Sequence, residues 1–123
     1  MAIQYSINRN IGIIEERWTG IVTAKDLQEY WRHYLEDVEV MSLRRTLVDL
    51  RQATIEFMGS EFDALIRAEV LPRLKGLDWK TAIVVSHPVQ YGISRQYQAF
   101  ADTYSKDSIF YDYSEAKKWL LQQ

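Results

Sequence analysis

The chain of 123 residues contains no cysteine, which excludes a disulfide framework, a thiol nucleophile and a cysteine metal site. It also has no apolar run near the ~18 residues that a membrane-spanning helix needs. Its first ten residues, MAIQYSINRN, lack the apolar core of a signal peptide. We therefore expect a cytoplasmic protein with no membrane insertion.

The chain has little histidine and no excess of positive charge. His33 and His87 are the only histidines, so we expect neither a metal centre nor a cofactor. Fifteen basic side chains stand against seventeen acidic ones, for a net charge of −2. Proteins that bind nucleic acids usually show a basic excess or stripe, so we expect no nucleic-acid partner. The densest cationic cluster, Arg44-Arg45 with Arg51 nearby, is interpreted as capping and solvating a strand.

What the chain does have is apolar and aromatic content. Apolar residues make up 47% of it and aromatic residues 13%, with eight tyrosines and four tryptophans. This length and composition are typical of one globular domain with a proper core, so we predict a single domain over residues 1–123.

The hydrophobic pattern changes period along the chain in a regular order. Residues 3–8 alternate apolar and polar, and residues 11–18 return as a second strand, which predicts an N-terminal hairpin closed by Gly20. Further strands are predicted at 45–50, 79–86 and 108–111, and helices at 24–37, from 60, at 89–105 and from 114. The resulting order, ββαβαβαβα, predicts an α/β domain in which the hairpin feeds a mostly parallel sheet with helices packed on it.

The prediction of a functional site rests on one stretch from Thr46 to Asp63, TLVDLRQATIEFMGSEFD. It is interpreted as a buried strand, a nine-residue connection from Arg51 to Gly59, and a helix that starts at Ser60. In a parallel sheet the carboxyl ends of the strands share one edge. That edge should gather a set of polar residues and the helix start: Asp49, Arg51, Ser86, His87, Asp112 and Ser60.

Ser60 allows two interpretations. As a helix N-cap, in a box closed by Asp63, its hydroxyl satisfies a free backbone N–H. The same helix N-terminus would tolerate a phosphate on Ser60, and phosphorylation would change the surface by almost two charges, enough to switch a partner.

The order of elements, and especially VDLRQATIEFMGSEF, resembles the STAS domain of anti-sigma factor antagonists and sulfate transporters. In that family an aspartate-bearing strand leads to a phenylalanine-methionine-aspartate-serine stretch whose serine is phosphorylated by a partner kinase. Phe57, Met58, Gly59 and Ser60 occupy those places here, so the resemblance matches Ser60 to the phosphorylated serine. Gly59 replaces the family's acidic residue. Glu61 and Phe62 replace the family's small serine-glycine pair.

The final stretch, EAKKWL, resembles divergent bacterial STAS-like proteins, whose fold is also similar to that of CRAL-TRIO lipid carriers. The resemblance implies a contact or phosphorylation edge that combines residues from the strand, the loop and the helix start. These residues are Asp49, Arg51, Met58, Gly59, Ser60, Glu61 and His87.

Three functions compete on this basis. The first is a non-enzymatic regulatory or protein-interaction module, with a protein partner or a homodimer. The second is a carrier or sensor of a small apolar ligand, suggested by the aromatic helix faces, which would need a cavity of about 300 Å³ or more. The third is a serine hydrolase in which Ser60 or Ser86 acts with His87 and Asp49, although no G-x-S-x-G elbow is present.

Overall fold

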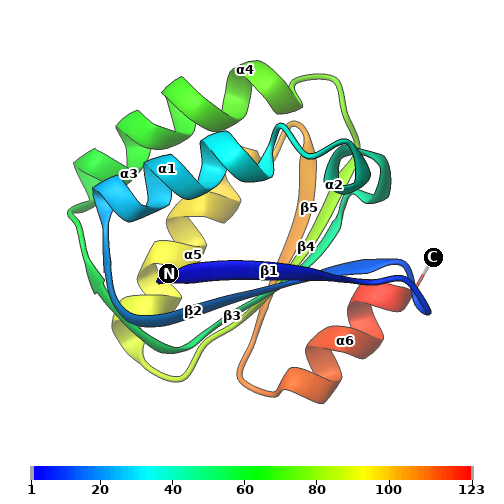
Figure 1. Cartoon of the computed structure of the whole chain (residues 1–123). Helices are drawn as coiled ribbons and strands as arrows, with labels where there is room; N and C mark the ends of the chain where they lie inside the picture. The colour runs from blue at the N-terminus through cyan, green and yellow to red at the C-terminus, as the bar shows by residue number, and fades with distance from the viewer. Residues whose placement is uncertain (1, 123) are drawn as a thin grey trace.

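The computed structural model describes residues 2–122, which form one sheet with helices on both faces (Figure 1). The strands are β1 (Ile3–Asn8), β2 (Ile13–Thr23), β3 (Arg45–Glu56), β4 (Trp79–Val84) and β5 (Ser105–Phe110). The helices are α1 (Ala24–Tyr34), α2 (Val38–Leu43), α3 (Gly59–Leu65), α4 (Leu71–Leu74), α5 (Pro88–Ala101) and α6 (Tyr113–Leu121). A π-helical segment, Ile66–Val70, joins α3 to α4. The predicted α/β class and alternating order are confirmed.

The five strands lie in sequence order, β1-β2-β3-β4-β5, with β1 antiparallel to β2 and every later pair parallel. Right-handed crossovers between parallel strands bring their helices to one face of a sheet. Accordingly α1, α3, α4 and α5 cover one face, which we call the large face, while α6 follows the last strand onto the opposite, small face (Figure 1).

Strand alternation divides the core between these two faces. Ile83 on β4 and Val85 directly after it join the large-face core, whereas Ala82 and Val84 join the small-face core. The unalternating apolar run in this strand therefore does mark burial on both faces, as expected for a central parallel strand.

The start of α1 follows directly from local chemistry. The Thr23 hydroxyl accepts the Asp26 backbone N–H at 3.2 Å, and the Asp26 carboxylate accepts the Thr23 N–H at 3.0 Å. This reciprocal capping box satisfies two backbone donors that the first helical turn leaves free.

Several predicted boundaries are wrong. Strand 108–111 is β5, which begins at Ser105, helix 89–105 is α5, which ends at Ala101, and α2 lies where a connection was predicted. Two further errors come from the length of β2 and β3. Gly20 does not close the hairpin: it lies inside β2 with φ of 67°, next to a register shift between Arg17 and Thr19. Residues 51–56 are not loop but strand, because they pair with the continuation of β2. Pairing between distant segments, which a local pattern does not report, extends both strands.

Candidate functional site

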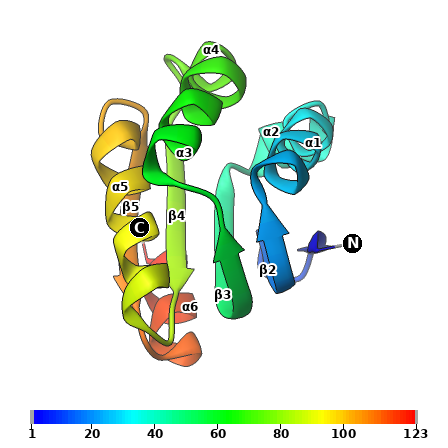
Figure 2. The ribbon, with the colours of Figure 1, turned by 90° about the vertical axis from the view of Figure 1, so that its left-hand side faces the viewer.

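The strands β2, β3, β4 and β5 are parallel, and the chain passes from their carboxyl ends into α1, α3, α5 and α6. Figure 2 shows the connections from β2 to α1, from β3 to α3 and from β4 to α5. β3 extends beyond the end of its neighbour β4 at this carboxyl edge of the sheet. Its pairing with β4 ends at Asp49 opposite Val84, but β3 continues to Glu56 alongside β2 alone. Beyond Asp49, the side of β3 that faced β4 therefore needs other hydrogen-bond partners.

The buried side chain of Gln90, in the first turn of α5, supplies those partners. Its amide nitrogen donates to the carbonyls of Leu50 at 2.6 Å and Ala53 at 3.0 Å. Its amide oxygen accepts the Ser86 backbone N–H at 2.8 Å. A side-chain amide thus bridges β3 and the end of β4 where no strand pairing remains, which is how backbone groups at this depth stay satisfied.

Asp49 and Arg51 form an ion pair at this edge, as the predicted site requires. The Arg51 guanidinium donates to both carboxylate oxygens at 3.0 Å, and the Arg51 backbone N–H donates to Oδ1 at 3.1 Å. Burial opposes ionisation of Asp49, but these hydrogen bonds hold its pKa below the usual value. Arg51 also lies 5.5 Å from the ring centroid of Tyr113, so the pair is held between β3 and α6.

Ser86 lies beside Arg51, but it is not set up as a nucleophile. Its hydroxyl donates to the Arg51 carbonyl at 3.3 Å and lies 3.2 Å from the Gln90 amide oxygen. His87 is exposed at the N-cap of α5, and its side chain makes no capping bond. Among residues 2–122, no hydrogen bond joins a serine hydroxyl to His87 or His87 to Asp49. The hydrolase hypothesis therefore lacks its nucleophile–base pair.

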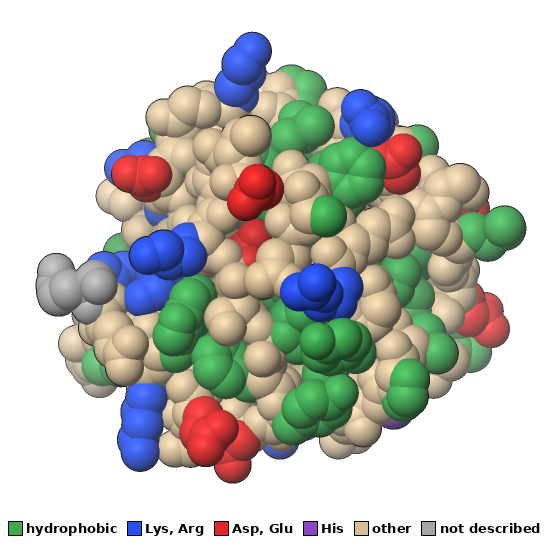
Figure 3. Space-filling model, turned by 180° about the vertical axis from the view of Figure 1, so that it is seen from behind, with side chains coloured by type: hydrophobic (Ala, Val, Ile, Leu, Met, Phe, Trp, Pro, Cys, Tyr) green, Lys and Arg blue, Asp and Glu red, His purple; other side chains and the backbone are tan. Residues whose placement is uncertain are grey.

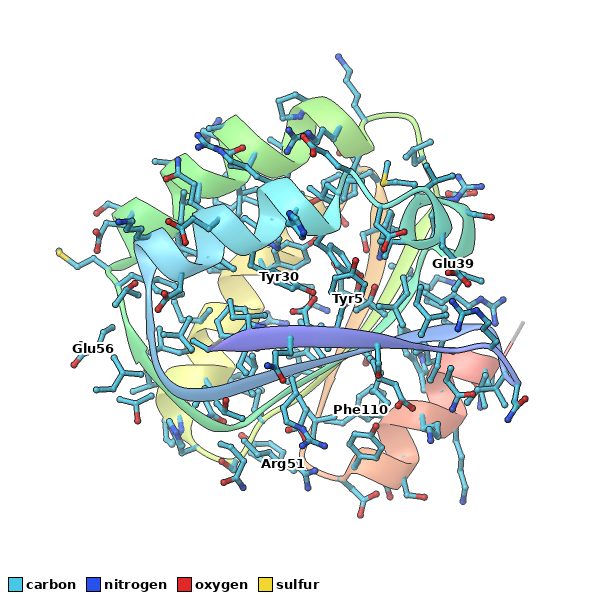
Figure 4. The ribbon with its side chains drawn as sticks, in the orientation of Figure 1. Tyr5, Tyr30, Glu39, Arg51, Glu56 and Phe110 are labelled. Atoms are coloured by element: carbon cyan, nitrogen blue, oxygen red, sulfur yellow. The ribbon has the colours of Figure 1, made fainter. Side chains whose placement is uncertain are left out.

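Ser60, Met58, Gly59 and Glu61 lie apart from this group. From Asp49, β3 runs on to Glu56 before the chain turns into α3, a distance of about 23 Å at the strand rise per residue. Figure 4 shows the resulting separation between Arg51 and Glu56. The structure thus divides the predicted site residues into two groups.

The helix start at this second group also differs from the prediction. Met58, not Ser60, is the N-cap of α3, and the Glu61 carboxylate accepts the Met58 backbone N–H at 2.8 Å. Ser60 is an exposed residue of the first turn and does not cap the helix. Gln96 of α5 donates to the Gly59 carbonyl at 2.6 Å, and a Cβ on Gly59 would come within 3.1 Å of the Gln96 oxygen.

Exposed apolar side chains gather at the same edge. Eight large hydrophobic side chains are exposed among the described residues, and five of them lie on segments at the strand carboxyl ends. We call these five the carboxyl-edge surface: Ile21, Met58, Val89, Tyr91 and Tyr111. Tyr91 and Tyr111 stack with ring centroids 6.2 Å apart. Figure 3 shows hydrophobic side chains low on the rear face, over the start of α5 and the loop before α6.

Acidic side chains outnumber basic ones around this surface. Glu56, Glu61, Asp112 and Glu115 are exposed there. Lys25, Arg51 and Arg17, which is in register with Asp49, are exposed basic residues of the same strands and helix starts, and Arg51 is already paired with Asp49. The segments that carry the carboxyl-edge surface therefore expose more acidic than basic side chains.

The aromatic residues of α1 and α5 mostly fill the space between helices and sheet. Trp31 stacks on Phe62 at 6.0 Å, and Tyr30 stacks on Tyr34 at 5.1 Å. They leave a partly enclosed cavity of about 70 Å³, bordered by Glu16, Trp79 and Tyr97 among others. Sites for drug-sized ligands usually measure about 300 Å³ or more, so this cavity has room only for a much smaller molecule.

Glu16 is the charged group of that cavity, and sequence analysis did not single it out. Its oxygens accept the Tyr30 hydroxyl and the Trp18 indole N–H, both at 2.7 Å. Burial raises the pKa of Glu16, and these two donors oppose the rise only in part. The sequence could have indicated the burial of Glu16, because strand alternation puts it on the same face as Ile14 and Trp18.

The geometry agrees with what comparison with known proteins shows. A crystal structure from Shewanella loihica PV-4, described as an uncharacterised protein of the DUF3478 family with a SpoIIAA-like fold, superposes with a TM-score of 0.67. The alignment covers 97% of this chain and 94% of that one, at 21% sequence identity. This chain has a SpoIIAA-like fold. The expected STAS-like architecture is thereby confirmed, at an identity that establishes fold alone.

No protein-family model and no curated protein matches the sequence. Within the described part of the chain, no helix is long and apolar enough to cross a membrane. The same residues contain no group of three or more histidine or acidic side chains placed to hold a metal ion. The SpoIIAA-like fold thus comes with an edge surface and a small cavity as its candidate sites.

Proposed function

We propose that this SpoIIAA-like domain is a non-enzymatic protein-interaction module that contacts its partner through the carboxyl-edge surface. The observation that carries the proposal is the concentration of exposed apolar side chains there: five of eight, including the stacked Tyr91–Tyr111 pair. Tyrosine and methionine are both enriched at protein interfaces, and tyrosine buries a large area at low conformational-entropy cost.

The charge around the surface indicates the chemistry of the partner. Glu56, Glu61, Asp112 and Glu115 are exposed on the same segments as these apolar residues. A partner with an apolar patch and a basic rim would complement this arrangement and would associate faster at low salt. Self-association is less favoured, because two copies would bring like charges together.

Ser60 is placed where a modification would affect such a partner. It is exposed in the first turn of α3, two residues after Met58 and beside Glu61. A negative charge at this position is compatible with the helix dipole, so Ser60→Asp should fold normally. It should weaken binding of a partner that contacts Met58, because it changes the charge at the contact.

The test is a quantitative comparison of co-purified proteins from the natural host, followed by binding measurements with the purified partner. We expect Met58→Ser and Tyr111→Ser each to weaken the partner about tenfold or more, as central interface residues do. Val38→Ser is the matched control, because Val38 is an exposed apolar residue of α2, outside the carboxyl-edge surface. A partner that binds all variants equally, or a wild-type protein that recovers no partner, would contradict the proposal.

A carrier of a small apolar molecule is the second candidate, favoured by the aromatic lining of the 70 Å³ cavity. Native mass spectrometry of protein from its own host separates the two functions. A small molecule that leaves on denaturation supports the carrier, and a stoichiometric protein partner supports the interaction module. A mass of two protomers would instead indicate a homodimer.

A further inference from the structure

The amino edge of the sheet, opposite the carboxyl-edge surface, carries a row of three cationic side chains. Arg45 on β3 is in register with Lys80 on β4, and Lys80 is in register with Lys106 on β5. Adjacent strands are about 4.8 Å apart, and residues in register share a face, so the three side chains start out as direct neighbours. Like charges in such positions destabilise a sheet. Sheet stability alone gives no reason for this row.

The C-terminus of α6 compensates only part of this charge. The Lys80 ammonium donates to the carbonyls of Trp119 and Gln122, both at 2.8 Å, and Arg45 donates to the carbonyl of Leu120 at 3.4 Å. These contacts place two cations at the negative end of a helix. Lys106 is exposed and makes no hydrogen bond or ion pair through its side chain within residues 2–122.

The row borders a groove of about 520 Å³, formed by the turns that precede β3, β4 and β5. This volume lies within the range of small-molecule sites. Four cationic residues line the groove, Arg44 together with the three of the row, against two acidic residues, Asp78 and Asp102. The local excess is therefore two positive charges, in a chain whose net charge is −2.

Arg44 is a second, independent sign that the groove is used. It has φ of 55° and ψ of 30° at the C-cap of α2, the left-handed conformation that glycine normally supplies. No other non-glycine residue of the described chain has a positive φ. Its guanidinium makes no ion pair or side-chain hydrogen bond with residues 2–122. The backbone therefore gives no reason for arginine here, whereas a ligand in the groove would.

We propose that this groove binds a small molecule that carries a phosphate group. Arg44 and Lys106 would donate charged hydrogen bonds to the phosphate oxygens, and Arg45 and Lys80 would supply positive charge held in place by α6. The planar arginine fork matches phosphate geometry, and lysine pairs with phosphate as a point charge. A phosphate dianion would neutralise the local excess of two charges.

The experiment measures binding of two probes to the full chain at low salt. Inorganic pyrophosphate, followed by titration calorimetry, represents a free phosphate compound. Phosphatidylcholine vesicles containing phosphatidic acid, followed by co-sedimentation, represent a lipid headgroup. We expect wild type to bind at least one probe, with affinity that falls as salt is raised. Binding of pyrophosphate identifies a soluble ligand, and binding of the vesicles alone identifies a headgroup.

Two variants make the test specific. Arg44→Gly and Lys106→Gln should each weaken binding about tenfold or more, as the loss of a charged hydrogen bond does. Both should fold at least as stably as wild type in thermal unfolding, because one removes an unfavourable backbone conformation and the other removes a like charge.

Lys118→Gln is the matched control, since it makes the same charge change at an exposed position of α6 outside the groove. It should leave binding unchanged. The proposal is overturned if wild type binds neither probe, or if both groove variants bind as wild type does. It is also overturned if the control loses as much affinity as they do, because binding would then reflect net charge alone.

Discussion

The two faces of the sheet are covered by helices, but different kinds of side chain fill the two interfaces. The fully buried residues of the small-face cluster are all aliphatic, and three aromatic residues pack against its margin: Ile13, Leu47, Ala82, Val84, Ala116 and Leu120, with Phe110, Tyr113 and Trp119. The large face buries aromatic side chains together with polar groups, including Glu16 and the Thr46 hydroxyl, and it retains the cavity. One set of strands serves both faces, because successive residues point to opposite sides. The small face holds α6 by aliphatic packing, with hydrogen bonds from Lys80 and Arg45 only at the end of the helix. The large face adds buried hydrogen bonds that fix the positions of its aromatic rings.

The largest expected effect is on the small face. Leu120→Ala should lower the free energy of unfolding by about 3 kcal/mol, because it opens a cavity in a cluster too small to collapse around it. Leu121→Ala, at the neighbouring and 37% exposed position, is the control and should cost less than about 1 kcal/mol. Urea unfolding measures both. Equal losses would show that α6 is not held by this cluster.

Thr46→Val should have the next largest effect, on the large face. The Thr46 hydroxyl lies 2.7 Å from the Tyr34 hydroxyl and accepts the Trp79 indole N–H at 3.1 Å. Valine keeps the shape but leaves buried polar groups unpaired, at a cost of about 2 kcal/mol. Thr54→Val, at an exposed position of the same strand, should stay within about 0.5 kcal/mol of wild type. If the two variants are equally stable, the polar groups of the large face contribute nothing to its stability.

A smaller effect should appear in the pH dependence of stability, and it comes from Asp107 on β5. One oxygen of this carboxylate is buried with no hydrogen-bond partner in the described chain, and burial raises its pKa from 3.8 to about 6. Between these values the folded state binds more protons than the unfolded state, so this residue makes stability fall as pH rises from about 4 to 6.

Asp107→Asn removes that titration, and we expect a gain on the order of 1 kcal/mol at pH 7 relative to wild type. At pH 4 the two proteins should be nearly equal in stability. Urea unfolding at both pH values measures the difference. A constant difference across the range would mean that Asp107 does not titrate in this interval.

The smallest effect compares two helix starts on the large face. Thr23→Ala should cost about 1 kcal/mol, because Thr23 caps α1 through its side chain. Ser60→Ala should cost no more than about 0.5 kcal/mol, because the cap of α3 is Met58. Thermal unfolding of the two variants gives the comparison directly. A larger loss at Ser60 would place it in a structural role that its exposed position does not indicate.

These two helix starts show what could be predicted and why. Both begin with a hydroxyl residue three positions before an aspartate, and the sequence pattern treats them alike. Thr23 is the cap because β2 ends there. Ser60 is not, because β3 continues to Glu56 and α3 begins at Gly59. The end of β3 depends on pairing with residues 19–23 of β2, which are distant in sequence. The local pattern therefore fits the cap of α1, but it assigns to Ser60 a cap position that the structure gives to Met58.

The candidate site shows the same division. The sequence places Asp49 and Arg51 at one edge of the sheet but assigns Arg51 to the loop. In the structure both lie on β3, two residues apart, and form an ion pair. The group around Ser60 could not be separated from them, because six further strand residues were interpreted as loop. Gln90 carried no signal, because its buried role exists only where β4 stops short of β3.

The sequence by itself determined the types and order of the elements, the alternation that divides the core, and the cap of α1, because each depends on contacts within a few residues. Only the tertiary structure decided where β3 ends, how the space beside it is filled, and which charges become neighbours. Arg45, Lys80 and Lys106 lie far apart along the chain and meet through strand register alone. Register is fixed by packing across the whole sheet, so no local window of sequence contains it.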